Sequence, residues 1–166
     1  MIDSEQLIKL FDQWNVPIFK YVFSRIGRRE DAEDITQEVF IKAWNHRHSF
    51  DPLKSSYKTW IFVIATNTIR DFLRSKRNQL HSELDGTISS NTDIKQETEH
   101  ALMAQYISTQ LRSLKEHDQE LIILRYRQDL SIKDISNILN IREGAVKVRL
   151  HRALQKLKKR CNLNPF

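Results

Sequence analysis

The chain has 166 residues, which is enough for one helical domain or two small ones. Hydrophobic residues make up 40% of it and charged residues 29%, so it can pack a core and stay soluble. Three glycines and three prolines leave little turn chemistry for a sheet-rich fold, which predicts the all-α class. The net charge of +6 favours a polyanionic partner.

One cysteine, Cys161, excludes an internal disulfide and indicates a reducing compartment. The first residues are polar and amphipathic and lack the apolar centre of a signal peptide. No apolar run approaches the roughly 20 residues that span a bilayer. We therefore expect a soluble cytoplasmic protein.

The first part of the chain predicts three helices. Apolar residues recur at helical spacing from Ser4 to about Arg25, with Pro17 marking a kink or break. A second helix is predicted over 31–44, where acidic residues come early and suit the helix dipole. After a loop over 46–56, a third is predicted over 57–77, with Thr66 on its polar face. These helices predict a first domain over residues 1–77.

The composition then changes. Residues 78–97 are polar, mostly acidic and nearly free of aromatic side chains, which predicts a flexible linker. The helical period resumes near 98, and Asp118 is expected to cap a short helix. We therefore predict a second domain over residues 98–166.

The most informative stretch, 130–160, predicts two helices joined by a tight turn. Ser131 is a good N-cap, and Asp134 three positions later completes an approximate capping box. Asn140 stands at the turn, and asparagine tolerates left-handed backbone angles. The second helix begins near Glu143, and these signals together favour a helix-turn-helix over an ordinary helical hairpin with a solvated basic face.

The second of these helices has two distinct faces. Val146, Leu150, Ala153, Leu154 and Leu157 share one face and are expected to be buried. The opposite face is polar and basic, and Gly144 and Ala145 keep its first turn slim. It carries Lys147, Val148, His151, Arg152 and Gln155. Lys147 and Arg152 suit phosphates or guanine edges, and Val148 suits a thymine methyl.

Signals for other chemistry are weak. The acidic residues at 31, 33, 34 and 38 spread around their helix, and the histidines show no clear ligand spacing, so we expect no metal. Phosphate-binding loops and nucleophile motifs are absent from the sequence, so we expect no cofactor and no enzyme activity. Aromatic residues beside a basic stripe in 57–76 could hold single-stranded nucleic acid, or the aromatics could simply be core.

Taken together, three stretches resemble the bacterial sigma-70 family of transcription initiation factors, and most closely its extracytoplasmic-function (ECF) group. The first domain of that family is similar to DAEDITQEVFIKAW at 31–44 and to YKTWIFVIATNTIRDFLRSKR at 57–77. The second is similar to 114–157, which contains the predicted helix-turn-helix. Asn140 stands where the family usually has glycine, and Thr66 where arginine is frequent.

The resemblance implies a non-catalytic subunit of RNA polymerase that selects promoters. Asp34, Gln37 and Glu38 would bind the clamp helices of the polymerase β′ subunit, while helices of the second domain would dock on the β flap. The implied DNA-binding residues fall into two groups. Those for the −10 element are Ser55, Ser56, Asn67, Arg70 and Arg74, and those for the −35 element are Arg142, Lys147, Val148, His151 and Arg152.

The resemblance also implies restraint by an anti-sigma factor, a partner that in this family is often bound to the membrane. Two other functions remain open from the residues themselves. A free-standing helix-turn-helix regulator would bind duplex DNA without polymerase, and a pure interaction protein would occupy polymerase or a regulator without reading promoters.

Overall fold

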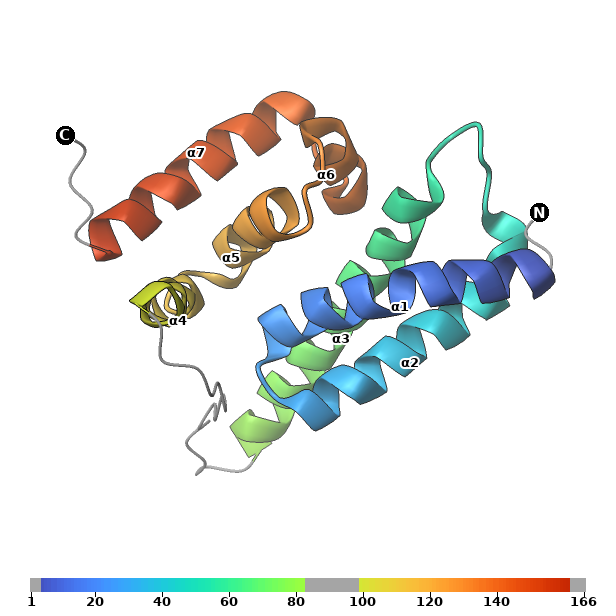
Figure 1. Ribbon diagram of the computed structural model, residues 1–166, viewed down its shortest axis with the longest axis horizontal. Helices are drawn as coiled ribbons and strands as arrows, with labels where there is room; N and C mark the ends of the chain where they lie inside the picture. Colours follow the sequence, from blue (N-terminus) through green and yellow to red (C-terminus); the bar gives the residue numbers. More distant parts are fainter. Residues whose placement is uncertain (1–3, 83–98, 162–166) are drawn as a thin grey trace. The chain divides into compact units, whose positions relative to one another are not determined.

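The computed structural model describes residues 4–82 and 99–161, which belong to two separate compact units. All regular structure in these two ranges is helical, which confirms the predicted all-α class (Figure 1). The predicted linker over 78–97 lies outside the described residues from 83 onward. Residues 78–82 belong to the last helix of the first unit, so that helix extends beyond its expected end at Arg77.

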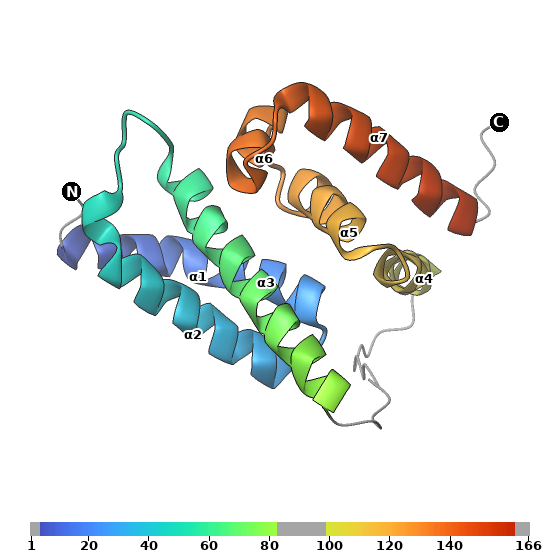
Figure 2. The same cartoon turned by 180° about the vertical axis from the view of Figure 1, so that it is seen from behind.

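The first unit contains α1 (Ser4–Ile26), α2 (Arg29–Asn45) and α3 (Tyr57–Ser82), with a 3₁₀ turn, η1 (Arg47–Ser49), after α2. All three long helices contact one another, and Figure 2 shows them from behind. Gly27, at φ 81°, reverses the chain between α1 and α2. The core between the helices contains Ile18, Tyr21, Val22, Ile35, Val39, Ile61, Phe62 and Ile69.

Pro17 does not break α1, contrary to one of the two outcomes expected from the sequence. The helix is continuous from Ser4 to Ile26, although proline lacks the N–H that would bond to the preceding turn. Ile18, Tyr21 and Val22, which follow Pro17, are all fully buried against α2 and α3. Burial of such side chains contributes about 1.5–3 kcal/mol each, which outweighs one lost hydrogen bond.

Thr66 lies in the core, so its predicted place on the polar face of α3 is wrong. Its side chain is fully buried, and its hydroxyl lies 3.0 Å from the hydroxyl of Tyr21, which is also buried. Each hydroxyl satisfies the other, which removes most of the cost of burying them.

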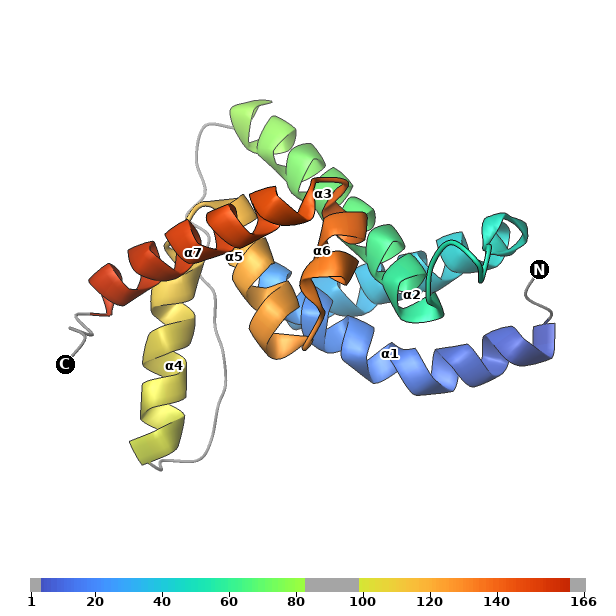
Figure 3. The ribbon, with the colours of Figure 1, turned by 90° about the horizontal axis from the view of Figure 1, so that it is seen from above.

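The second unit contains α4 (Glu99–Arg112), α5 (Glu116–Ile122), α6 (Ile132–Leu139) and α7 (Glu143–Arg160). A π-helical turn, η2 (Ile123–Arg127), extends α5. Both α4 and α5 contact α7, and Figure 3 shows α4 at a steep angle to α7, with one end of α4 beside the C-terminal half of α7. The core of this unit includes Leu111, Leu121, Ile123, Leu124, Leu130, Ile135, Val146 and Ala153.

Candidate nucleic-acid interfaces

The helix-turn-helix of α6 and α7 forms as the sequence predicts. Ser131 Oγ accepts a hydrogen bond from Asp134 N at 3.0 Å, and Asp134 Oδ2 accepts one from Ser131 N at 3.2 Å, so the capping box is complete. Asn140 adopts the left-handed conformation, with φ 52° and ψ 49°. Ile141 N then donates to Ser136 O, and Ser136 Oγ donates to Ile141 O. These bonds fix the direction in which α7 leaves the turn.

The two faces of α7 also separate as predicted. Val146, Leu150 and Ala153 are buried, whereas Leu154 and Leu157 are half-buried. The opposite face is exposed over its whole length, and it contains Lys147, Val148, His151, Arg152 and Gln155. Val148 is 51% exposed, which leaves an apolar side chain in the middle of a basic surface. Arg142 is the N-cap of α7; it is exposed, and its side chain makes no capping bond.

Gly144, in the first turn of α7, has no steric role within the described residues. A Cβ atom at this position would meet no atom within 4 Å. Glycine costs a helix roughly 0.5–1 kcal/mol relative to alanine, so packing in the unit does not account for it. Because this residue has no side chain, a partner can approach the exposed start of the helix closely.

A basic pocket beside this face was missed by the sequence analysis. His117 and Asp118 from α5 line it together with Arg149, Arg152 and Lys156 from α7. Asp118 does not cap α5 as expected, because it lies inside the first turn, is 3% exposed, and accepts a 2.6 Å bond from Lys156 Nζ. His117 Nε2 lies 3.3 Å from the other carboxylate oxygen. Arg152 thus borders both the exposed face and this pocket.

The expected −10 residues on α3 share one exposed strip. Asn67, Arg70 and Arg74 follow one another at helical spacing, and all three are exposed. Arg74 Nη2 lies 3.0 Å from Asp71 Oδ1, but both groups are solvent-exposed, so the pair contributes little energy.

The loop before α3 is ordered by its own side chains. Ser56 Oγ accepts a bond from Thr59 N at 3.1 Å, so this residue caps α3; Ser55 before it is half-buried. The rings of Phe50, Tyr57 and Trp60 contact one another at centroid distances of 5.4 to 5.9 Å. Burial raises the pKa of the Tyr57 phenol to about 12. The aromatic residues at 57 and 60 therefore form a cluster at the base of the loop, while Phe62 is core.

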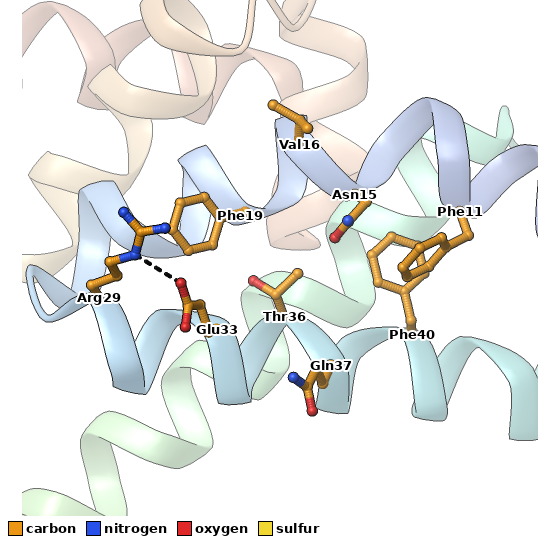
Figure 4. Close-up of a pocket in the computed structure, with 9 residues that line it drawn as sticks. All are labelled: Phe11, Asn15, Val16, Phe19, Arg29, Glu33, Thr36, Gln37 and Phe40. Carbon is orange, nitrogen blue, oxygen red and sulfur yellow. Dashed lines mark hydrogen bonds and ion pairs between the residues drawn. The ribbon is translucent and has the colours of Figure 1, made fainter.

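Asp34, Gln37 and Glu38 are all exposed on α2. Glu38 pairs with Lys42 one turn later at 2.7 Å. Gln37 also borders a groove between α1 and α2 that the sequence analysis did not predict (Figure 4). Phe11, Val16, Phe19 and Phe40 supply the apolar part of this groove, and Arg29 and Glu33 of α2 pair with each other at 2.8 Å at one end. Phe11 is 42% exposed in this groove.

No described helix is both long and apolar enough to cross a membrane. The described histidines, cysteine and carboxylates do not gather into any group of three that could hold a metal ion. An exposed basic face on a helix-turn-helix is typical of a DNA-binding protein, and the separate first unit presents an exposed polar strip of its own.

Comparison with protein families assigns both units. The model described as Sigma-70 region 2 matches residues 10–79, and the model described as Sigma-70, region 4 matches residues 104–157. Among curated proteins, the chain is 34% identical to RNA polymerase sigma factor YlaC of Bacillus subtilis, over 96% of this chain and 94% of that protein. It is 30% identical to ECF RNA polymerase sigma factor SigW of the same organism, over 95% and 89%.

Another similar protein is longer. The chain is 26% identical to ECF RNA polymerase sigma factor BldN of Streptomyces coelicolor, over 93% of this chain but 60% of that protein. Solved structures share the fold: RpoE in complex with the anti-sigma factor NepR from Bartonella quintana has 23% identity and a TM-score of 0.83, covering 98% of this chain and 100% of that one. CnrH in complex with the cytosolic domain of CnrY has 21% identity and a TM-score of 0.71, covering 98% and 92%.

The chain therefore belongs to the sigma-70 family, and within it to the ECF RNA polymerase sigma factors. These are transcription initiation factors that bind core RNA polymerase and direct it to promoters.

Proposed function

We propose that the two units of this ECF sigma factor divide promoter recognition between them. The second unit reads the −35 element in duplex DNA, and the first docks on core RNA polymerase and holds the −10 element. The observation that carries this division is that each unit presents its own exposed polar or basic helix face, on α7 and on α3.

The −35 contacts are assigned to the exposed face of α7. Lys147 and Arg152 bind phosphates or guanine edges, Val148 packs on a thymine methyl, and Arg142 and His151 complete the surface. The first turn of α7 is the part that enters the major groove, as in other helix-turn-helix proteins.

The −10 contacts are assigned to the loop before α3 and to α3 itself. Asn67, Arg70 and Arg74 follow the DNA backbone along the exposed strip of the helix. Ser55 and the backbone around Ser56 hold a base from the separated strand, while the Ser56 hydroxyl keeps its role as helix cap. An extruded base costs a few kcal/mol of unstacking, which these contacts offset.

The contact surface for core polymerase is assigned to α2. Asp34, Gln37 and Glu38 form an exposed acidic and polar patch, and the apolar groove beside Gln37 extends it. A surface with a polar rim and an apolar centre is typical of protein interfaces. Helices of the second unit dock on the β flap. We also propose that the chain acts in the cytoplasm, where core polymerase works, and catalyses no reaction itself.

An anti-sigma factor, either soluble or bound to the membrane, is the proposed regulator. Two similar structures support this partner: RpoE was solved with the anti-sigma factor NepR, and CnrH with the cytosolic domain of CnrY.

The test is run-off transcription with purified core polymerase on fragments of the source genome. We expect specific transcripts that disappear in a variant combining Asp34→Ala with Gln37→Ala. Glu5→Gln, an exposed carboxylate on α1, is the matched control and should transcribe normally. A shift of duplex DNA by the protein alone, with no transcripts, would instead support a free-standing regulator. Polymerase binding without transcripts would support a pure interaction protein.

The −35 assignment has a separate test in the salt dependence of binding. Lys147→Ala should make the dependence of log affinity for a −35 duplex on log salt concentration less steep. The slope should change by about 1, the value for one phosphate contact. Lys133→Ala on α6 is an exposed lysine outside the proposed face, and it should leave the slope unchanged.

A further inference from the structure

Leu53 is the most exposed large apolar side chain in the described part of the chain. It is 95% exposed and lies at the tip of the loop that joins η1 to α3. Figures 1 and 2 show this loop standing out as an arch beside the three-helix bundle of the first unit. A single exposed leucine is ordinary in a flexible segment, but the loop around this one is held in place.

Asp51 organises the tip of the loop. Its side-chain Oδ1 accepts a hydrogen bond from Leu53 N at 3.0 Å, and its backbone oxygen accepts bonds from Lys54 N and Ser55 N at 3.1 and 3.2 Å. Between Asp51 and Leu53, the ring of Pro52 fixes the φ angle of that residue. The Leu53 side chain is therefore presented to solvent by a rigid turn.

The aromatic cluster holds the base of the same loop. Phe50 stands just before the turn and packs against Tyr57 and Trp60 in the first turn of α3, at 5.9 and 5.4 Å between ring centroids. The turn that carries Leu53 thus lies between two fixed points, the cluster below it and the Ser56 cap of α3. The Leu53 side chain is therefore held in a fixed position relative to α3.

The segment that contains the loop has a net positive charge. Residues 47–58 contain Arg47, Lys54 and Lys58 against the single carboxylate of Asp51. Lys54 Nζ lies 3.5 Å from Asp51 Oδ2; the lysine side chain is 83% exposed and the aspartate side chain 38%. An apolar tip on a cationic loop fits nucleic acid, because phosphates meet the cations while the apolar side chain meets a base.

We propose that Leu53 is a wedge for strand separation at the −10 element. Its side chain enters beside a base step as the strands part and replaces the stacking partner that a base loses. Other DNA-bending proteins insert leucine, isoleucine or methionine between base steps in this way. The proposal rests on the proposed function, because it needs the loop at the −10 element, and it adds a role for a residue whose side chain is apolar.

The test compares two promoter templates, one fully duplex and one with the −10 region already unpaired. Wild-type holoenzyme and holoenzyme with Leu53→Ser are assayed for open-complex formation by permanganate reactivity and for run-off transcripts. We expect Leu53→Ser to lower open-complex formation on duplex DNA about tenfold and to match wild type on the unpaired template. Leu53→Met should retain activity on both. Because Leu53 is exposed, none of these changes should affect folding.

Two further variants control the comparison. Asp51→Ala keeps the leucine and the backbone bonds of the turn but removes the side-chain hydrogen bond to Leu53 N, so we expect a partial defect on duplex DNA only. Leu102→Ser on α4 removes another exposed leucine, and any loss should be equal on the two templates.

Three results would overturn the proposal. Equal activity of Leu53→Ser and wild type on duplex DNA would show that the tip has no role in melting. An equal loss on both templates would assign Leu53 to a later step, and a loss of affinity for core polymerase would assign it to protein contact. Wild-type holoenzyme that makes no transcript from either template would instead refute the proposed function, and the wedge with it.

Discussion

Gly144→Ala is expected to stabilise the protein and weaken its binding to DNA. The glycine lies in the first turn of α7, where a Cβ atom would meet nothing within 4 Å. Alanine should therefore gain helix propensity without steric cost, worth about 0.5–1 kcal/mol. In the DNA complex the added methyl would enter the space kept open for the groove, and overpacking a close contact costs about 1–3 kcal/mol. Since 1.4 kcal/mol is a factor of about ten, the loss of affinity should be easy to measure.

The two effects can be measured on the same full-length protein. All three tryptophans, at 14, 44 and 60, belong to the first unit, so their fluorescence follows that unit alone, whereas circular dichroism follows the helices of both. The circular-dichroism transition should rise by about 4–8 °C for each kcal/mol gained in a unit of this size. The tryptophan transition should not move.

The control is Thr109→Ala on α4, an exposed hydroxyl that bonds only to its own helix, at Gln105 O. It should change neither the affinity for a −35 duplex nor, by more than a few tenths of a kcal/mol, the stability. Unchanged DNA affinity in Gly144→Ala would refute the argument that a partner requires the glycine. Lower stability of Gly144→Ala would refute the argument that the folded unit itself does not require the glycine.

Three further predictions concern the folded state. Ser131→Ala should cost the second unit about 1 kcal/mol by circular dichroism, and Asn140→Ala about 1–2 kcal/mol, while Asn140→Gly should cost nothing because glycine accepts φ 52°. Tyr21→Phe and Thr66→Val should each cost about 1–3 kcal/mol in the tryptophan transition, and the double variant little more than either alone, since both changes remove the same hydrogen bond. Stability of the first unit should fall as pH rises from 10.0 towards 12, because unfolding lets the Tyr57 phenol ionise at its ordinary pKa; Tyr57→Phe should remove that part of the fall.

The helix-turn-helix could be predicted from the sequence because its determinants are local. Ser131 and Asp134 bond to each other across one helical turn, and Asn140 needs only its own backbone angles to end α6. The faces of α7 follow from spacing along one helix in the same way. Where a signal and its physical cause lie within a few residues, the sequence alone is sufficient.

The wrong predictions share the opposite property. From the sequence, Thr66 is expected at the surface because it is polar. In the structure it is buried, because the hydroxyl of Tyr21, 45 positions away, is the partner of its own hydroxyl. Aspartate is a residue type that often caps helices, but the carboxylate of Asp118 is buried because it bonds to Lys156, 38 positions away. Pro17 marks a break by its own chemistry, and only the packing of its neighbours keeps α1 continuous. Helical periodicity gives no information on which distant residue an inward-facing polar group will meet.

The pairing of Asp118 with Lys156 also changes the view of the basic end of α7. From the sequence, the cations at 156, 158, 159 and 160 are equivalent sources of attraction to the DNA backbone. In the structure Lys156 bonds to the buried carboxylate of Asp118, and Arg160 donates to Ser113 on the neighbouring connection. A cation whose charge is balanced by a buried carboxylate releases little counterion when DNA binds, so it adds little to the salt-dependent part of the affinity. Lys156 therefore joins α7 to α5, and we expect it to contribute less to the salt-dependent affinity for DNA than Lys147, which is exposed on the proposed −35 face.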